Sequence, residues 1–230
     1  MECNNDFSFV YYQDKNFYYF WKPAGLASSR WKSVSFLDLM CDENLNGDIR
    51  DIVNSQLEFF WKEKEFWLLN RLDWPTTWLL YFAKNSRVYN KFRELQKEWK
   101  VDKFYVAEVY GNIQDWVDRN GNIISYPIMH HRYNEDRMVV IRWDEDKLKW
   151  KWNVHEVATE ICEIDYNGRD NLSTVLIKIH KWIRHQIRAH LSAIWCPICG
   201  DNLYCKSKTQ SFDKLQLFSV WMCVDDLLIK

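Results

Sequence analysis

Glycine is scarce in this chain. Only 6 of its 230 residues are glycine, whereas the usual share of about 7% would give about sixteen. Proline is rarer still, with 4 residues, and there is no apolar run of the roughly 18 residues that a membrane-spanning helix needs. The first residues also lack the basic region and apolar core of a secretory signal. We therefore expect no membrane segment and no secretion.

A strong excess of either charge is also missing, since the net charge is −1 at pH 7. With this balance, a nucleic-acid-binding protein must concentrate its positive charge locally. Residues 178–190 meet that condition, because they hold four Lys or Arg, three His and no acidic residue. On charge alone, a solvated surface is the more common reading of such a stretch. The 7 cysteines, an odd number without a dense framework, favour a reducing cytoplasm.

Tryptophan, in contrast, is abundant, with 14 residues. Trp99 follows the helical pattern that ends near Leu95, and Trp195 follows the pattern that ends at Ile194. Helices commonly end at a left-handed glycine with proline shortly after, and Pro197 follows Trp195 in this way. Counting every tryptophan as glycine would bring the glycine content close to its usual share. We hypothesise that UGA codons, read as glycine in the source organism, were translated here as tryptophan.

Two other interpretations of the tryptophans stay open at this point. They are native residues that serve as core or as platforms on which RNA bases stack, or they mark a degraded gene. Stacking platforms would have no reason to collect at helix ends and turns. The codons at these positions distinguish the recoding hypothesis from the other two interpretations.

One segment carries most of the functional information. Residues 70–73 read Asn-Arg-Leu-Asp, and residues 76–85 read Thr-Thr-Trp-Leu-Leu-Tyr-Phe-Ala-Lys-Asn. Arg71 and Asp73 are two residues apart, so their side chains leave an extended segment on the same side. A carboxylate beside a guanidinium stays ionised at neutral pH and can act as a nucleophile. Taken alone, such a pair is more often a surface ion pair.

This segment resembles the signature H-R-L-D-x-x-T-S-G-L-L-L-F-A-K-N of the RluA-type pseudouridine synthases, which modify RNA. Asn70 replaces the usual histidine and Trp78 replaces the glycine. Ile183 stands where the family usually has a basic residue, with Arg184 one place later. Four further segments resemble the family in the same order: Lys22–Leu26 (K-P-x-G-L), Lys103–Gly111 (K-x-Y-x-A-x-V-x-G), Trp182–Leu191 (G-R-x-H-Q-I-R-x-H-L) and Pro197–Tyr204 (P-I-x-G-D-x-x-Y).

The resemblance implies a reaction on RNA. The bond from ribose to the uracil nitrogen breaks, and the ribose rejoins carbon 5 of a base that has left the RNA stack. Asp73 would attack the nucleotide or assist elimination at the sugar, Arg188 would pair with Asp73, and Tyr105 would stack on the uracil. Arg71 would fill the space of the flipped base or contact phosphate. The residues implied in RNA binding are Arg71, Lys103, Arg184, His185 and Gln186.

The pattern along the chain predicts an α+β fold. We expect a single pseudouridine synthase catalytic domain over residues 1–230, with a central mixed, mostly antiparallel sheet flanked by helices and loops. We expect no N-terminal S4-type RNA-binding domain, which the family often carries, because the first motif already begins at Lys22. We expect strands in 8–20 and at 79–83, 103–110, 138–142, 155–164, 173–180 and 215–220, and helices in 33–60 and at 86–98 and 184–194.

The chemistry leaves two alternatives to weigh. A catalytically inactive RNA-binding protein of the same fold would not need the carboxylate of Asp73. A zinc site at Cys196 and Cys199, with Cys205 as a third ligand, lacks the second Cys-x-x-Cys of a zinc knuckle pair. We expect no metal or organic cofactor, ribosomal or transfer RNA as the partner, and a monomer in the cytoplasm.

Overall fold

The computed structural model describes residues 11–29, 35–40, 68–142, 154–205 and 212–224. The chain forms two compact units, unit 1 over residues 1–94 and unit 2 over residues 95–230. In the described ranges no helix is long and apolar enough to cross a bilayer.

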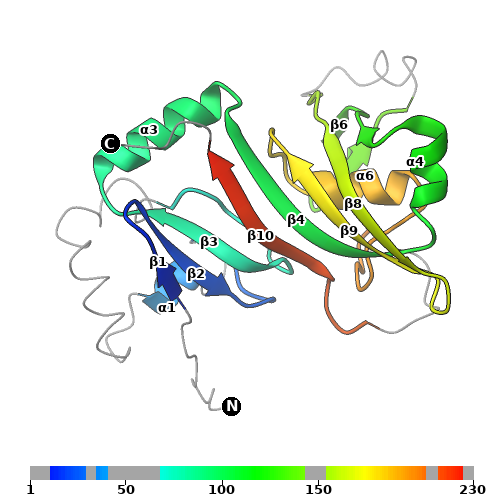
Figure 1. Cartoon of the computed structure of the whole chain (residues 1–230), viewed down its shortest axis with the longest axis horizontal. Coiled ribbons are helices and arrows are strands. Elements are labelled where there is room, and N and C mark those ends of the chain that lie inside the picture. Colours follow the sequence, from blue (N-terminus) through cyan, green and yellow to red (C-terminus); the bar gives the residue numbers. More distant parts are fainter. Residues whose placement is uncertain (1–10, 30–34, 41–67, 143–153, 206–211, 225–230) are drawn as a thin grey trace. The chain divides into compact units, whose positions relative to one another are not determined.

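Unit 1 is built on three strands that pair antiparallel in chain order. They are β1 (Tyr11–Gln13), β2 (Phe17–Lys22) and β3 (Thr77–Ala83), accompanied by the short helix α1 (Phe36–Met40) and by the start of helix α3 (Ser86–Lys97) (Figure 1). The strands are rich in Tyr, Phe and Leu, residue types that pack well on a pleated surface.

The interior of unit 1 is aromatic. Phe20 of β2 makes edge contacts with Phe36 of α1 and Phe82 of β3, with ring centroids 6.1 and 5.4 Å apart. Helix α3 begins at the predicted residue, because the side chain of Asn85 accepts a hydrogen bond from the backbone N–H of Val88 at 3.0 Å. An Asn cap of this kind satisfies one of the free N–H groups at a helix start.

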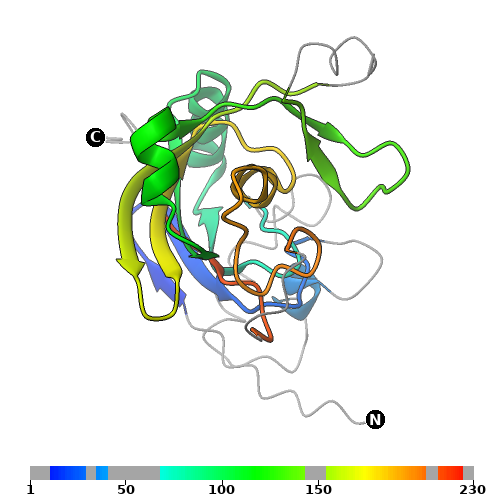
Figure 2. The same ribbon diagram turned by 90° about the vertical axis from the view of Figure 1, so that its right-hand side faces the viewer.

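Unit 2 holds a five-stranded antiparallel arrangement in the order β10-β4-β9-β8-β5 and a separate hairpin β6-β7. The helix α6 packs against β7 and β8, and Figure 2 views this helix nearly end-on. The elements are β4 (Val101–Tyr110), α4 (Gln114–Asn120), β5 (Ile123–Ile124), β6 (Ile128–His130), β7 (Met138–Val140), β8 (Thr159–Asn167), β9 (Leu172–Ile179), α6 (Gln186–Ala193) and β10 (Leu217–Val224).

The predicted α+β class and the mostly antiparallel pairing are confirmed. The strongly patterned predictions agree best: β4 alternates buried and half-buried residues along its whole length, and α3 ends within one residue of the predicted helix. In unit 2, α4 and β6 lie outside the ranges for which the sequence predicts a helix or a strand. Most of the predicted helical region 33–60 lies outside the described residues. The single domain over 1–230 stays a prediction.

Candidate active site

Asp73 lies in a loop of unit 1 directly before β3. The neighbouring Leu72 is buried, and Ser28 holds its backbone on both sides: the Ser28 Oγ accepts from the Leu72 N–H at 2.9 Å and donates to the Leu72 carbonyl at 3.1 Å. Because side chains alternate along an extended segment, this inward Leu72 turns Arg71 and Asp73 the other way. Arg71 is exposed and Asp73 is half-buried, as the spacing predicts.

The chain turns sharply after Asp73. The Thr76 N–H donates to the Asp73 carbonyl at 3.0 Å, which closes the turn, and the Gly25 N–H donates to the Trp74 carbonyl at 2.9 Å. Gly25 has a φ of 80°, a conformation that suits glycine. The Lys22–Leu26 motif therefore contacts the Asp73 loop through its backbone.

Lys22 strengthens that contact and is a site residue that sequence reasoning missed. Its side chain is fully buried, and Nζ donates to the carbonyls of Pro23 at 2.9 Å, Leu26 at 2.7 Å and Trp74 at 3.4 Å. Burial lowers the pKa of Lys22 to about 7, and the charge of Asp73 partly offsets the effect. The signal for Lys22 was present in the early K-P-x-G-L segment, to which no role had been assigned.

Asn70, the departure from the usual histidine, anchors the loop to β3. Its Nδ2 donates to the Leu79 carbonyl at 3.1 Å, and its Oδ1 accepts from the Tyr81 N–H at 2.8 Å. The side-chain amide of Asn70 thus makes two hydrogen bonds to the backbone of β3. The loop that carries Asp73 is tied down on both sides, which keeps the carboxylate in a defined place.

In unit 2, Arg188 of α6 makes a buried ion pair that the sequence did not predict. Its Nε and Nη2 donate to the two carboxylate oxygens of Asp201 at 2.7 and 2.8 Å, and both residues are at most 5% exposed. Asp201 belongs to the G-D of the fourth motif, so the signal was there without a role. The predicted pairing of Arg188 with Asp73 joins the two units and stays a prediction.

Tyr204 completes the surroundings of Arg188. The guanidinium carbon lies 5.2 Å from the centroid of the Tyr204 ring, and the Tyr204 hydroxyl accepts from the Met138 N–H at 2.8 Å. Burial raises the pKa of Tyr204 to about 12. A planar ion pair stacked on an aromatic face holds the arginine in one orientation.

Two of the predicted RNA contacts, His185 and Gln186, are buried and bonded inside the protein. His185 Nδ1 lies 3.2 Å from the Tyr204 hydroxyl, and burial together with the charge of Arg188 lowers the pKa of His185 to about 3. Gln186 donates to the Ala158 carbonyl at 2.9 Å. These partners favour a role in positioning α6 over direct contact with RNA.

A second buried chain of hydrogen bonds runs through α6. His190 Nε2 lies 2.8 Å from the Tyr126 carbonyl, which can only accept, so Nε2 carries the proton and Nδ1 accepts from the Thr159 hydroxyl at 2.8 Å. Gln186 donates to the same hydroxyl at 3.3 Å. Burial lowers the pKa of His190 to about 4, which keeps it neutral near pH 7.

The remaining predicted residues differ in exposure. Tyr105 is buried in β4, and Lys103, two residues earlier, is also buried, with Nζ 4.6 Å from the centroid of the Trp182 ring. Arg184 is exposed and donates to the Glu135 carbonyl and the Asp136 carboxylate at 2.9 and 3.3 Å. Of the five predicted RNA-binding side chains, only Arg71 and Arg184 lie at the surface.

Cys196 and Cys199 of the zinc alternative are buried as protonated thiols. Burial raises the pKa of Cys196 to about 11 and of Cys199 to about 12. Within the described ranges, no group of three His, Cys, Asp or Glu side chains is arranged to hold a metal ion.

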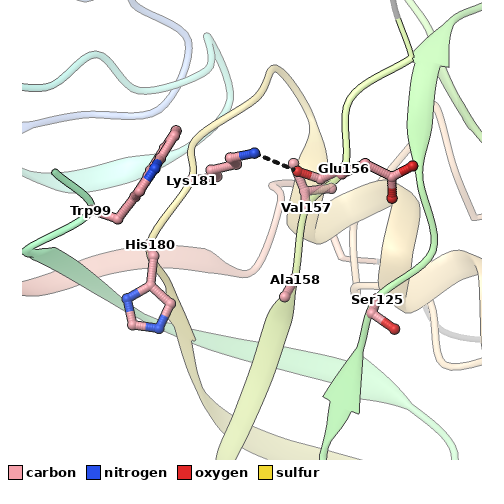
Figure 3. Close-up of a pocket in the computed structure, with 7 residues that line it drawn as sticks. All are labelled: Trp99, Ser125, Glu156, Val157, Ala158, His180 and Lys181. Atoms are coloured by element: carbon pink, nitrogen blue, oxygen red, sulfur yellow. Dashed lines mark hydrogen bonds between the residues drawn. The ribbon is translucent and has the colours of Figure 1, made fainter. Parts of the chain in front are cut away.

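A pocket of about 570 Å³ lies elsewhere in unit 2, and no predicted site residue lines it. Lys181 crosses it, donating to the Glu156 carbonyl at 3.1 Å with its Nζ 4.7 Å from the centroid of the Trp99 ring (Figure 3). The surface that lines the pocket is mostly apolar, with Trp99 at one side. The pocket therefore gives no support to a second reaction centre.

The comparisons with known proteins agree with the motifs. A family model described as RNA pseudouridylate synthase matches residues 16–193. The chain belongs to this family. Across 207 residues, this synthase family member is 29% identical to ribosomal large subunit pseudouridine synthase C of Rickettsia bellii, covering 90% of this chain and 60% of that relative. It is 27% identical over 199 residues to tRNA pseudouridine synthase C of Haemophilus influenzae, covering 85% of this chain and 74% of that protein.

The fold of the family is also found among solved structures. Human RNA pseudouridylate synthase domain containing 1 matches with a TM-score of 0.65 at 20% identity, over 98% of this chain and 82% of that one. The chain spans less than two thirds of the length of several of its relatives. The predicted family is confirmed.

Proposed function

We propose that this chain is an RNA pseudouridine synthase that isomerises specific uridines in ribosomal or transfer RNA. The observation that carries the proposal is the R-L-D loop with Asp73, tied down on both sides, in a chain of the RNA pseudouridylate synthase family. The two substrate classes come from relatives whose names specify the large ribosomal subunit and tRNA.

In this reaction Asp73 acts at the sugar of a flipped uridine, by attack on the nucleotide or by assisting elimination. The bond between the ribose and N1 breaks, the uracil turns, and a bond to carbon 5 forms. The proton on carbon 5 then leaves, and N1 ends with a proton, so atoms balance without a redox step. Tyr105 stacks on the uracil and takes the carbon 5 proton, and Arg188 pairs with Asp73 and keeps it ionised.

The burial of the side chains divides the RNA-binding residues into two groups. Arg71 is exposed and contacts phosphate or fills the place of the flipped base, and the exposed Arg184 also contacts the RNA. Lys103, His185 and Gln186 lie on or beside the elements that carry Tyr105 and Arg188, and His185 and Gln186 are hydrogen-bonded inside the protein. These three residues therefore act by holding β4 and α6 in place. The protein works as a monomer in the cytoplasm, a setting that suits the free cysteines among the described residues.

The test compares Asp73→Asn with Asp165→Asn, which changes an exposed carboxylate of β8. RNA labelled with tritium at carbon 5 of uridine reports the reaction, because the label leaves when the ribose moves to that carbon. We expect Asp73→Asn to lose at least about a hundredfold in rate while RNA binding is retained, and Asp165→Asn to match the parent. Turnover by Asp73→Asn equal to the parent would reject Asp73 as the catalytic group.

The same assay separates the enzyme from an inactive RNA-binding protein of this fold. Tritium release from ribosomal or transfer RNA of a strain that lacks the gene supports the proposal. RNA binding without release from either RNA would favour the inactive protein. Light scattering of the purified protein tests the monomer.

A further inference from the structure

Tryptophan occupies unusual places in this structure. Eight of the 14 tryptophans lie in the described part of the chain, and none of the eight belongs to the buried core. Tryptophan is rarely fully buried in folded proteins, but most of its large side chain is buried on average. Five of the eight are 44–81% exposed: Trp21, Trp74, Trp99, Trp195 and Trp221.

Three tryptophans also have a left-handed backbone. The φ angles are 83° at Trp78, 61° at Trp99 and 67° at Trp195. Among the described residues, only two other non-glycine residues, Asn171 and His185, have positive φ. In this region the Cβ of an L-residue crowds the following carbonyl oxygen, so glycine is the usual occupant and a bulky side chain is rare.

Trp99 closes α3 in a Schellman motif. The Lys100 N–H donates to the Leu95 carbonyl at 2.9 Å, and the Trp99 N–H donates to the Gln96 carbonyl at 3.3 Å. These are the two hydrogen bonds that define the motif, and they place Trp99 at its left-handed position, where glycine is the common residue.

Trp195 closes α6 in the same motif. The Cys196 N–H donates to the Leu191 carbonyl at 3.1 Å, and the Trp195 N–H donates to the Ser192 carbonyl at 3.2 Å. Two helices of different sequence thus end in the same way, each with tryptophan at the glycine position. A common cause at the level of the codon explains this repetition, whereas packing does not, since the two side chains are 53% and 81% exposed.

Trp78 is the third case, at the start of β3 and five residues after Asp73. It pairs with Lys22 across the sheet, and its ring lies 5.2 Å from that of Trp21. Trp182, which the sequence also marked as a glycine position, has no positive φ. The backbone conformation therefore favours glycine at three of the four positions that the sequence marks, namely 78, 99 and 195 but not 182.

We infer that glycine is the natural residue at the tryptophan positions of this chain, because UGA codons are read as glycine in the source organism. The inference does not depend on the proposed function. It changes the surface of the protein, since the side of the pocket formed by Trp99 in Figure 3 is absent when glycine stands there. It also opens the start of β3 beside the Asp73 loop by removing the indole of Trp78.

The first experiment identifies which residue the natural protein carries at the tryptophan positions. Mass spectrometry of the protein isolated from its source should show peptides spanning positions 99 and 195 that are lighter by the difference between tryptophan and glycine. The gene should read UGA at both positions. UGG codons, or tryptophan in the natural peptides, would overturn the inference and leave exposed base-stacking platforms as the explanation.

A second experiment tests the conformational argument on the chain that carries tryptophan. Trp99 and Trp195 are each changed to Gly and to Ala, and Trp221, in β10 without positive φ, serves as the control. We expect the folding equilibrium constant of the Gly variant to exceed that of the Ala variant by about tenfold at 99 and 195. At 221 the order should reverse, because glycine weakens a strand. Equal folding equilibrium constants for the Gly and Ala variants at 99 and 195 would contradict the claim that the backbone at these positions favours glycine.

Discussion

Arg188 and Asp201 form a buried ion pair in unit 2. Two charge-assisted hydrogen bonds of 2.7 and 2.8 Å fix the guanidinium, and the Tyr204 ring lies against it. Asp201 also accepts from the backbone of the loop that follows it, at the N–H of Leu203. The pair thus joins α6 to that loop, and a change at either residue has a structural effect that must be separated from a chemical one.

A cycle of Arg188→Gln, Asp201→Asn and the double variant makes that separation. Each single change leaves a buried charge without its partner and should lower the free energy of unfolding by about 3–5 kcal/mol. The loss of unfolding free energy in the double variant should be at least about 1 kcal/mol smaller than the sum of the two single losses, because its two amides can pair with each other. Urea unfolding measures all three.

The double variant also tests the role of Arg188 in the reaction. If it folds, we expect its single-turnover rate to stay far below that of the parent while RNA binding is retained. Full activity of the folded double variant would show that Arg188 serves the fold alone.

Lys22 gives a prediction for pH dependence. Its folded pKa of about 7 lies below the ordinary value of 10.5, so between these pH values the unfolded chain binds more protons than the folded one. Stability should therefore rise with pH from about 7 to about 10 in the parent, relative to Lys22→Met, which has no such proton. Lys15→Met, at an exposed position, is the control and should follow the parent. Parallel pH profiles of Lys22→Met and the parent would contradict a buried, weakly basic Lys22.

At the scale of elements, the turn at Gly200, which follows α6, packs closely against the backbone just before β10. Gly200 has a φ of 72°, and a Cβ there would clash with the Lys214 carbonyl oxygen. Gly121, which follows α4, has a similar φ of 81° but open space around it. The two glycines separate backbone strain from steric contact.

Gly121→Ala should cost about 1–2 kcal/mol of stability through strain alone. Gly200→Ala should cost about 1–3 kcal/mol more, because the β10 side of the loop must move away from the new methyl group. Thermal and urea unfolding measure both values. Equal costs for the two variants would mean that the contact with Lys214 relaxes freely.

At the scale of the whole molecule, the tryptophans together lower the expected stability of the fold. A left-handed bulky residue costs about 1–3 kcal/mol, and three are described. Their sum is a large fraction of a typical stability of about 5–15 kcal/mol. Surface exposure of several indoles adds an apolar surface that favours association between chains.

A chain with glycine at all 14 tryptophan positions should therefore express in soluble form and act on RNA, whereas the chain with tryptophan should aggregate or lose activity. Reverting only Trp78 and Trp182 should restore part of the activity if the tryptophan chain folds. Soluble yield, light scattering and tritium release measure the difference. A fully soluble and active tryptophan chain would count against this account of its fold.

Local sequence was enough to establish the family, the α+β class and the long patterned elements, since these depend on residues close together in the chain. It also identified Trp99 and Trp195 as helix stops, because a Schellman end involves only the last turn and the residues after it. Periodicity and local turn chemistry carry such information without any knowledge of distant contacts.

Which groups are buried together became apparent only in the folded chain. Asp201 as the partner of Arg188, the three carbonyls around Lys22 and the inward positions of His185 and Gln186 depend on segments that meet after folding. A motif places these residues on an element, but it does not say which side chain lies opposite. That choice is made by packing, where desolvated polar groups require the partners that the fold brings within hydrogen-bonding distance.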